Sequence, residues 1–357
     1  MKTNKLILML AAAAMPFFTA CSDDNDDPEQ PAGKERILVV CKGGWGMNNS
    51  TVAVISDSVV TNNWLELGDT GNDIILVGDT VVAIAVNTSN LVQFVGKASG
   101  VDLGSTEIPN VRKLAASKDG KYVYATSYAN DGYVARIDAS NFTLVDTCNV
   151  GYDPEGIAFY NNRLYVANTG GYHNFCEHTV SVIDADKMEV THSIETGYYN
   201  LYGPVSLADK YLLLNASGNY ADLPSGTVII NLETEEVKTF DFGCSINCTD
   251  GENFYTIGSE YDENWQAHYT AHTISVSTLT ATDGFGVYTA AEENIDELTA
   301  PNGAYISPVD KTLYIGDARS YVTNGAVYAF GNDGSVKGKW EIEGINPGHF
   351  LSVTVNQ

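Results

Sequence analysis

The chain repeats one short pattern seven times, and this repeat constrains its fold more than any other feature. In the clearest copy, residues 152–156 form a loop with Pro and Gly, and three short apolar runs follow at 157–159, 164–168 and 180–184. Each run is too short for a helix and is bounded by Gly, Asn, Asp or Pro, which is typical of β-strands. Successive copies are spaced by about 40–60 residues, close to the period of a four-stranded propeller blade.

The repeat predicts an all-β fold, a seven-bladed β-propeller that forms one domain. The predicted blades cover residues 36–71, 72–108, 109–150, 151–197, 198–243, 244–298 and 299–344. The first blade lacks the inner strand that opens the others, and a matching strand occurs at the C-terminus, in residues 350–355. We therefore expect the C-terminal strand to join the first blade and close the ring, which protects open sheet edges. We expect the strand tyrosines to be core residues: Tyr124, Tyr165, Tyr255 and Tyr314.

The first 20 residues are typical of a lipoprotein signal peptide, with a basic start and an apolar stretch at Leu6–Phe18. The following Phe18–Cys21 segment resembles a bacterial lipobox, so we expect lipidation of Cys21; an ordinary signal peptide cut near Ala20 is the alternative. Residues 21–35 then read as an acidic tether and residues 36–357 as the propeller domain. The acidic run in the tether resembles the export signal of surface lipoproteins in Bacteroidetes, which implies a lipid-anchored protein on the outer surface of the outer membrane.

Charge and cysteine content narrow the functional classes. A formal net charge of −26 repels phosphate, which argues against nucleic acid and against an anionic membrane surface as partners. Apart from Cys21 the cysteines are odd in number, so at most two disulfides can form. We interpret them as small core residues, with one disulfide as an alternative and the pairing left open: Cys41, Cys148, Cys176, Cys244 and Cys248.

Alternate connections of a blade fall on opposite faces of a propeller. One face, called the plain face below, receives tight turns with ordinary turn residues at 117–120, 161–162, 250–251, 308–310 and 332–334. The other, called the loop face, receives longer loops that are rich in aromatic and amide side chains, at 43–47, 128–131, 170–175, 218–220, 261–269 and 319–321, with the inter-blade segments around 152 and 198–202.

The loop face is the predicted binding surface. Tyr and Trp combine a large apolar surface with a hydrogen-bonding group and are common in binding sites. The candidate ligand-binding residues are Trp45, Tyr128, Tyr152, Tyr172, His173, Tyr199, Tyr202, Tyr220, Trp265, Tyr269, Arg319 and Tyr321. The alternative is that these rings only pack loop against loop.

The sequence offers little that points to catalysis. It contains no zinc-protease, nucleophile-elbow, phosphate-loop or dinucleotide motif, so we predict a protein that is not an enzyme, with no catalytic residue and no cofactor. His268 and His272 have no evident third ligand, and a cluster of His173, His178, Cys176 and Glu177 is no better defined, so no metal site is predicted. The loop carboxylates Asp153, Glu155 and Asp262 are interpreted as solvated.

The repeat residues Pro154–Ala158, Leu164–Asn168 and Val180–Asp184 resemble those of the YVTN-type, YncE-like seven-bladed propellers. With the lipobox and the acidic run, the chain is most similar to the Bacteroidetes surface lipoproteins of the BtuG group. That resemblance implies capture of cobalamin, or a related corrinoid, and its transfer to a TonB-dependent outer-membrane transporter. It carries over no individual site residue.

Two alternatives stay open: a binding module for a glycan or a protein, and an enzyme of the lactonase or lyase kind. An enzyme should bring two or more carboxylates or histidines together at the axial opening of the ring. A corrinoid binder should instead show a wide aromatic bowl.

Overall fold

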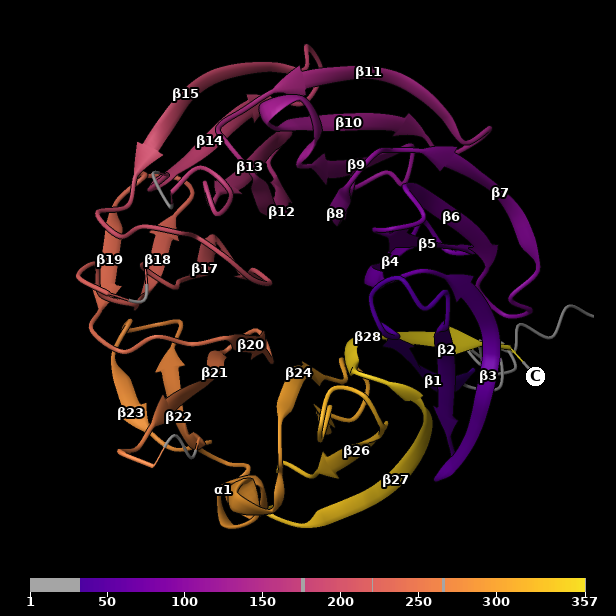
Figure 1. The fold of residues 1–357 in the computed structure, drawn as a ribbon, viewed down its shortest axis with the longest axis vertical. Coiled ribbons are helices and arrows are strands. Elements are labelled where there is room, and N and C mark those ends of the chain that lie inside the picture. Colours follow the sequence, from indigo (N-terminus) through magenta and orange to yellow (C-terminus); the bar gives the residue numbers. More distant parts are fainter. Residues whose placement is uncertain (1–32, 175–176, 220, 265–266, 357) are drawn as a thin grey trace, which may run out of the picture.

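A computed structural model describes residues 33–174, 177–219, 221–264 and 267–356. In it, seven four-stranded antiparallel sheets are arranged in a ring around a central axis (Figure 1). The chain is therefore a seven-bladed β-propeller, as the repeat predicts. The predicted signal peptide, Cys21 and residues 22–32 lie outside the described residues. The first strand begins at Lys34, two residues before the predicted start of the domain.

The blades follow the predicted boundaries closely, and in each blade the four strands succeed one another from the axis outward. Blade one consists of β28 (Pro347–Val355), β1 (Lys34–Cys41), β2 (Ser50–Ser56) and β3 (Val59–Gly68). Blade two consists of β4 (Gly71–Val77), β5 (Val81–Val86), β6 (Leu91–Gly96) and β7 (Asp102–Glu107). Blade three consists of β8 (Val111–Ala116), β9 (Tyr122–Ser127), β10 (Tyr133–Asp138) and β11 (Thr143–Asn149).

The remaining blades repeat the same order. Blade four consists of β12 (Pro154–Tyr160), β13 (Arg163–Asn168), β14 (Thr179–Asp184) and β15 (Glu189–Glu195). Blade five consists of β16 (Ser206–Ala208), β17 (Tyr211–Ala216), β18 (Gly226–Asn231) and β19 (Val237–Phe240). Blade six consists of β20 (Ile246–Thr249), β21 (Asn253–Tyr261), β22 (Ala267–Ser275) and β23 (Ala281–Asp283). Blade seven consists of β24 (Pro301–Ile306), β25 (Leu313–Asp317), β26 (Asn324–Phe330) and β27 (Val336–Ile345). The described helical segments are η1 (Ala129–Asp131), α1 (Thr289–Glu293) and η2 (Ile295–Glu297).

The C-terminal strand closes the ring, as predicted. β28 pairs antiparallel with β1, from Lys34 opposite Val355 to Cys41 opposite Pro347, so the two ends of the domain lie side by side (Figure 1). The inner strands β24 and β28 approach so closely that a Cβ at Gly303 would lie 1.8 Å from the carbonyl oxygen of Gly348. Only glycine fits at this contact.

The hydrophobic core lies between neighbouring sheets, because each blade packs its apolar side chains against the next blade. One cluster joins blades two and three, and another joins blades seven and one through Tyr314 and Phe350. The four strand tyrosines predicted to be core residues are all buried. The cysteines Cys41, Cys148, Cys244 and Cys248 are buried free thiols, as expected for small core residues, and Cys176 lies outside the described part of the chain.

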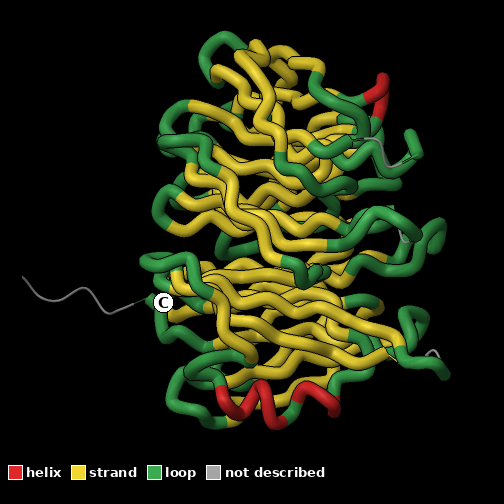
Figure 2. The backbone as a smooth tube through the Cα atoms, turned by 90° about the vertical axis from the view of Figure 1, so that its left-hand side faces the viewer, coloured by secondary structure: helices red, strands yellow, loops and turns green. Residues whose placement is uncertain are grey.

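The two faces of the ring differ as the strand order predicts. Seen from the side, the longer loops and η1 lie at one edge, and the C-terminal end of β28 lies at the other (Figure 2). Lys34 pairs with Val355, so both ends of the described domain lie on the plain face. No helix among the described residues is long and apolar enough to cross a membrane.

Candidate functional site

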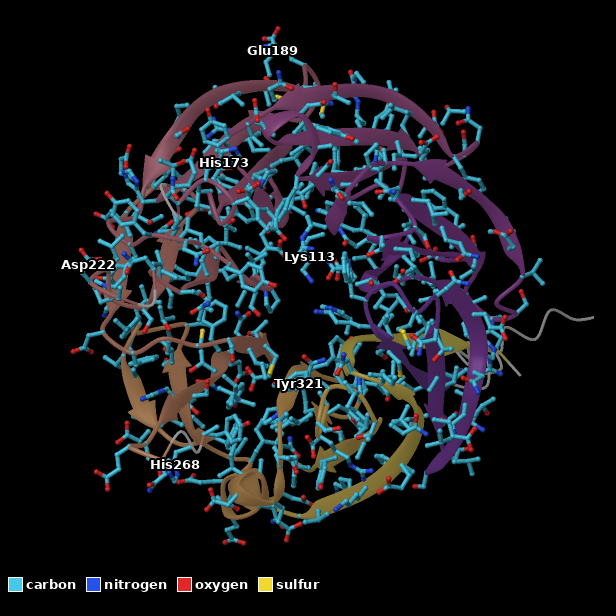
Figure 3. All side chains as sticks on the ribbon, in the orientation of Figure 1. Lys113, His173, Glu189, Asp222, His268 and Tyr321 are labelled. Carbon is cyan, nitrogen blue, oxygen red and sulfur yellow. The ribbon has the colours of Figure 1, made fainter. Side chains whose placement is uncertain are left out.

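A cavity of about 490 Å³ lies on the propeller axis, between the inner strands. Its wall contains charged and amide side chains, and Tyr202 and Tyr321 contribute to it from loop-face segments. Lys113 and Tyr321 both lie near the centre of the ring in Figure 3. The cavity is therefore continuous with the face that carries the predicted binding residues.

One wall is built around Glu155, which follows Pro154 at the start of β12. The guanidinium of Arg112, on β8 of the neighbouring blade, donates to both carboxylate oxygens, from Nε at 2.7 Å and from Nη2 at 3.0 Å. The hydroxyl of Tyr128 donates to Oε2, and the Arg112 guanidinium lies 4.6 Å from the centre of the Tyr128 ring. Burial alone would raise the pKa of Glu155, but Arg112 and then Lys113 hold it below its usual value. Glu155 is therefore an ionised, fully occupied carboxylate.

Two lysines share this wall with Asp73. The Lys113 ammonium donates to the Asn72 carbonyl at 2.7 Å, and the Asp73 carboxylate accepts from the backbone N–H of Leu114 at 2.8 Å. Burial, then the positive charges of Lys113 and Arg112, lowers the pKa of Lys42 to about 8. Burial also lowers the pKa of Lys113 and raises that of Asp73, although each charge partly offsets the other. Three basic side chains and two carboxylates thus meet at the axis.

Neutral polar groups complete the cavity. His349 on β28 has a buried Nε2 atom without a hydrogen-bond partner, and burial next to Lys113 and Lys42 lowers its pKa well below the usual value. The imidazole is therefore neutral at pH 7. On the opposite side, Ser206 donates to the Asn247 side chain at 2.6 Å, and the Asn247 amide donates to the Pro204 carbonyl at 2.9 Å. These uncharged groups face the charged wall across the cavity.

Five of the predicted binding aromatics are well exposed, and they come from several blades. Trp45 and Tyr172 are 83% exposed, Tyr321 is 52%, Tyr202 is 44% and Tyr152 is 41% exposed. They lie on the β1–β2, β13–β14 and β25–β26 loops and on the connections from β11 to β12 and from β15 to β16. Two of these five rings also contact a neighbouring ring, since Tyr152 stacks on His173 and Tyr172 meets Tyr128 edge to face, but all five keep a large exposed surface.

The other candidates make contacts within the protein. The Tyr128 hydroxyl donates to Glu155, and the Tyr199 ring packs at a tilt against His178 with ring centres 4.6 Å apart. The Tyr269 hydroxyl donates to the Thr299 carbonyl at 2.8 Å. Arg319 donates from Nη2 to both Glu341 oxygens at 2.6 Å, on outer strand β27. The contacts of these four side chains are those expected if they pack loop against loop. Tyr220 and Trp265 lie outside the described residues.

His173 belongs to a small network on the loop face, away from the centre of the ring in Figure 3. Its Nδ1 lies 3.0 Å from Asp153 Oδ2, and its ring stacks on Tyr152 at 4.2 Å. Asp153 also accepts from the Tyr172 backbone N–H at 2.8 Å, so one carboxylate fixes the loop that presents Tyr172. The interpretation of Asp153 and Glu155 as solvated is wrong: each is 2% exposed, because each has strong hydrogen-bond donors that compensate its burial.

The two histidines of blade six are not drawn together. His268 lies 3.4 Å from Asp262 and His272 lies 3.6 Å from Asp283, and His272 stacks on Phe242 with ring centres 3.7 Å apart. His268 is far from the axis in Figure 3. Among the described residues, no group of three or more potential ligands could hold a metal ion.

The axial charges were missed by the sequence analysis, although the repeat holds a signal for them. Each blade has a pair of residues at or near the start of its inner strand, and these are often polar. The pairs are Asn72–Asp73, Arg112–Lys113, Glu155–Gly156, Val205–Ser206, Ile246–Asn247, Asn302–Gly303 and Gly348–His349. Charged residues at these two repeat positions would have indicated a polar axis.

Comparisons with solved structures agree on the fold. The chain is similar to a functionally unknown protein from Desulfotomaculum acetoxidans, with 13% identity over 90% of this chain and 99% of that one and a TM-score of 0.63. It is also similar to Kuenenia stuttgartiensis hydrazine synthase, with 18% identity over 72% and 76% of the two chains and a TM-score of 0.59. The WD40 repeats of RRP9 match with 11% identity over 77% and 81% of the two chains and a TM-score of 0.54. At these identities the likeness shows the fold alone. No family model and no curated protein matches the chain.

Proposed function

We propose that this protein is a binding protein that captures a broad ligand on its loop face, and that the ligand is cobalamin or a related corrinoid. The observation that carries the proposal is the set of exposed loop-face rings: Tyr202 and Tyr321 line the axial cavity, and Trp45 and Tyr172 are the most exposed. Only a wide ligand could contact rings from blades one, four and seven at once. A corrinoid is a broad disc with an amide rim, and it suits aromatic rings mixed with amide side chains.

The experiment is a calorimetric titration of cyanocobalamin into the soluble domain. Trp45→Ala and Tyr172→Ala are the informative variants, because both rings are so exposed that their removal should leave the packing unchanged. If they anchor the ligand, each should weaken binding by about 30-fold to nearly 1,000-fold, which corresponds to roughly 2–4 kcal/mol.

The matched control is Asp333→Ala, on an exposed turn of the plain face, and it should leave the affinity unchanged. An absence of heat with cyanocobalamin at micromolar protein would refute the corrinoid proposal. Titrations with glycans and pull-downs of proteins would then test the alternative binding functions.

The enzyme alternative has one observation in its favour, because Asp73, Glu155 and His349 do converge at the axis. However, both oxygens of Glu155 are occupied by Arg112 and Tyr128, and Asp73 accepts a backbone N–H. A general base needs an oxygen within reach of the substrate proton. These contacts favour a binding role over a lactonase or lyase activity.

We also propose that Cys21 anchors the protein by lipid on the cell surface, where it would pass its ligand to a TonB-dependent transporter. The Cys21→Ala variant should leave the membrane fraction. Replacement of Asp23, Asp24, Asp26 and Asp27 by Ala should keep the protein lipidated but facing the periplasm. Protease treatment of whole cells measures the difference. Equal cleavage of this variant and the unchanged protein would mean that the acidic run acts only as a tether.

A further inference from the structure

The axial cavity is lined by two lysines and two carboxylates, and Arg112, which is bound to one of these carboxylates, adds a third positive charge, although the protein as a whole is strongly acidic. Lys42, Arg112 and Lys113 face only two carboxylates, Asp73 and Glu155. Glu155 is paired with Arg112, so its charge is already compensated by a bidentate ion pair. The excess positive charge therefore resides on the two lysines.

Lys42 has a charged side chain to which the described part of the fold gives no partner. It follows β1, lines the cavity, and among the described residues its ammonium group makes no hydrogen bond and no ion pair. Its backbone N–H donates to the Asn346 carbonyl at 3.1 Å, which fixes the position of the residue beside β28. Lys42 is partly exposed to the cavity, so its ammonium group keeps some contact with water there. An ammonium group that is largely removed from water without a partner still destabilises a protein, and an apolar side chain of similar length would reduce that cost.

His349 supplies a second, independent observation at the same place. It lines the same cavity as Lys42 and Lys113, and its buried Nε2 has no hydrogen-bond partner. Unsatisfied buried polar atoms are rare in folded proteins and often indicate a missing partner. The fold thus holds an unpaired ammonium group and an unsatisfied imidazole around one cavity.

We propose that the axial cavity is a binding site for a small oxyanion, a carboxylate or phosphate group, held by Lys42, Lys113 and His349. Such a group accepts charge-assisted hydrogen bonds from both ammonium groups and compensates the excess charge. His349 in the neutral form can donate one further hydrogen bond. This site lies beneath the loop-face aromatics and does not depend on what they bind.

The direct test is calorimetric titration of sodium phosphate, and separately of sodium acetate, into the soluble domain without corrinoid at pH 7. Ionic strength is held constant with sodium chloride, because any salt screens the charges of so acidic a protein. We expect saturable binding of at least one anion beyond the chloride background. Lys42→Met should weaken it at least ten-fold, whereas Lys118→Met, which removes an exposed lysine of the plain face, should leave it unchanged.

A second measurement needs no variant and covers the case in which Lys42→Met does not fold. Acetate stays fully ionised above pH 7, so any change of its affinity with pH reflects the titration of groups on the protein. It should fall steadily above about pH 8, where Lys42 loses its proton in the surroundings of Lys113, Arg112, Asp73, Glu155 and His349. If neither anion binds beyond chloride, or if Lys42→Met binds both as tightly as the unchanged protein, the proposal is wrong.

Competition identifies the source of the anion. If phosphate at saturation lowers the affinity for cyanocobalamin, the cavity accepts an anionic group of the face ligand. An unchanged affinity assigns the cavity to a free anion. The failure of cyanocobalamin binding would overturn the proposed function and leave the anion titrations unaffected.

Discussion

Deletion of the last ten residues should prevent stable folding, because it removes β28 after Pro347. The deleted segment carries three buried apolar side chains, Phe350, Val353 and Val355, which pack against blades seven, one and two. Burial of each is worth about 1.5–3 kcal/mol, so the loss amounts to roughly 5–9 kcal/mol before the unpaired edge of β1 is counted. Typical domains are stable by only about 5–15 kcal/mol.

Circular dichroism, thermal melting and urea denaturation would measure the effect. Single substitutions in β28 separate the contributions of its side chains. Phe350→Ala should lower the free energy of unfolding by about 3–5 kcal/mol. Thr354→Ala, at an exposed position of the same strand, should change it little. If the truncated protein melted at the same temperature as the intact one, closure of the ring by β28 would not stabilise the fold and the reasoning would be refuted.

Two further predictions concern the axial charges. Lys42→Met should raise the free energy of unfolding near pH 7 by up to about 3 kcal/mol, because burial lowers the folded-state pKa of Lys42 from 10.5 to about 8. As pH rises, the folded protein releases this proton before the unfolded chain does, so the stability gained by Lys42→Met should vanish between about pH 8 and pH 10.5. Urea denaturation at several pH values measures this, and a gain that stays constant with pH would contradict the prediction. Glu155→Ala should lower the free energy of unfolding by about 3–5 kcal/mol, because it leaves the Arg112 guanidinium buried without its ion pair. The exposed ion pair of Asp333 is the control, since Asp333→Ala should change the free energy of unfolding little. Equal losses for the two variants would show that burial of the Glu155 pair does not matter.

The fold could be predicted from the sequence because its information is local and repeated. Each blade carries its own strand pattern, and the missing inner strand of blade one has a visible counterpart at residues 350–355. The exposed positions of Trp45 and Tyr172 also followed from strand order alone, because alternate connections fall on opposite faces.

The axial site could not be predicted in the same way, because its members come together only when the ring closes. Lys42, Asp73 and Glu155 lie on three different blades, and in the sequence each is an isolated charge beside a short strand. The acidic composition of the whole chain suggested that Glu155 is solvated, and this interpretation was wrong. A carboxylate of an acidic protein is usually solvated, but its partner Arg112 lies 43 residues away and becomes visible only in the folded blade pair.

The position of the two chain ends on the plain face decides how the molecule is presented. A domain attached to a surface through the segment before Lys34 exposes its loop face outward, so immobilisation through either end would leave the loop face accessible. If Cys21 is the anchor, delivery of a ligand to a transporter in the same membrane requires the domain to turn over. Residues 22–33 can extend about 40 Å at most. The length of this segment, rather than the shape of the site, then limits how far the domain can rotate toward its partner.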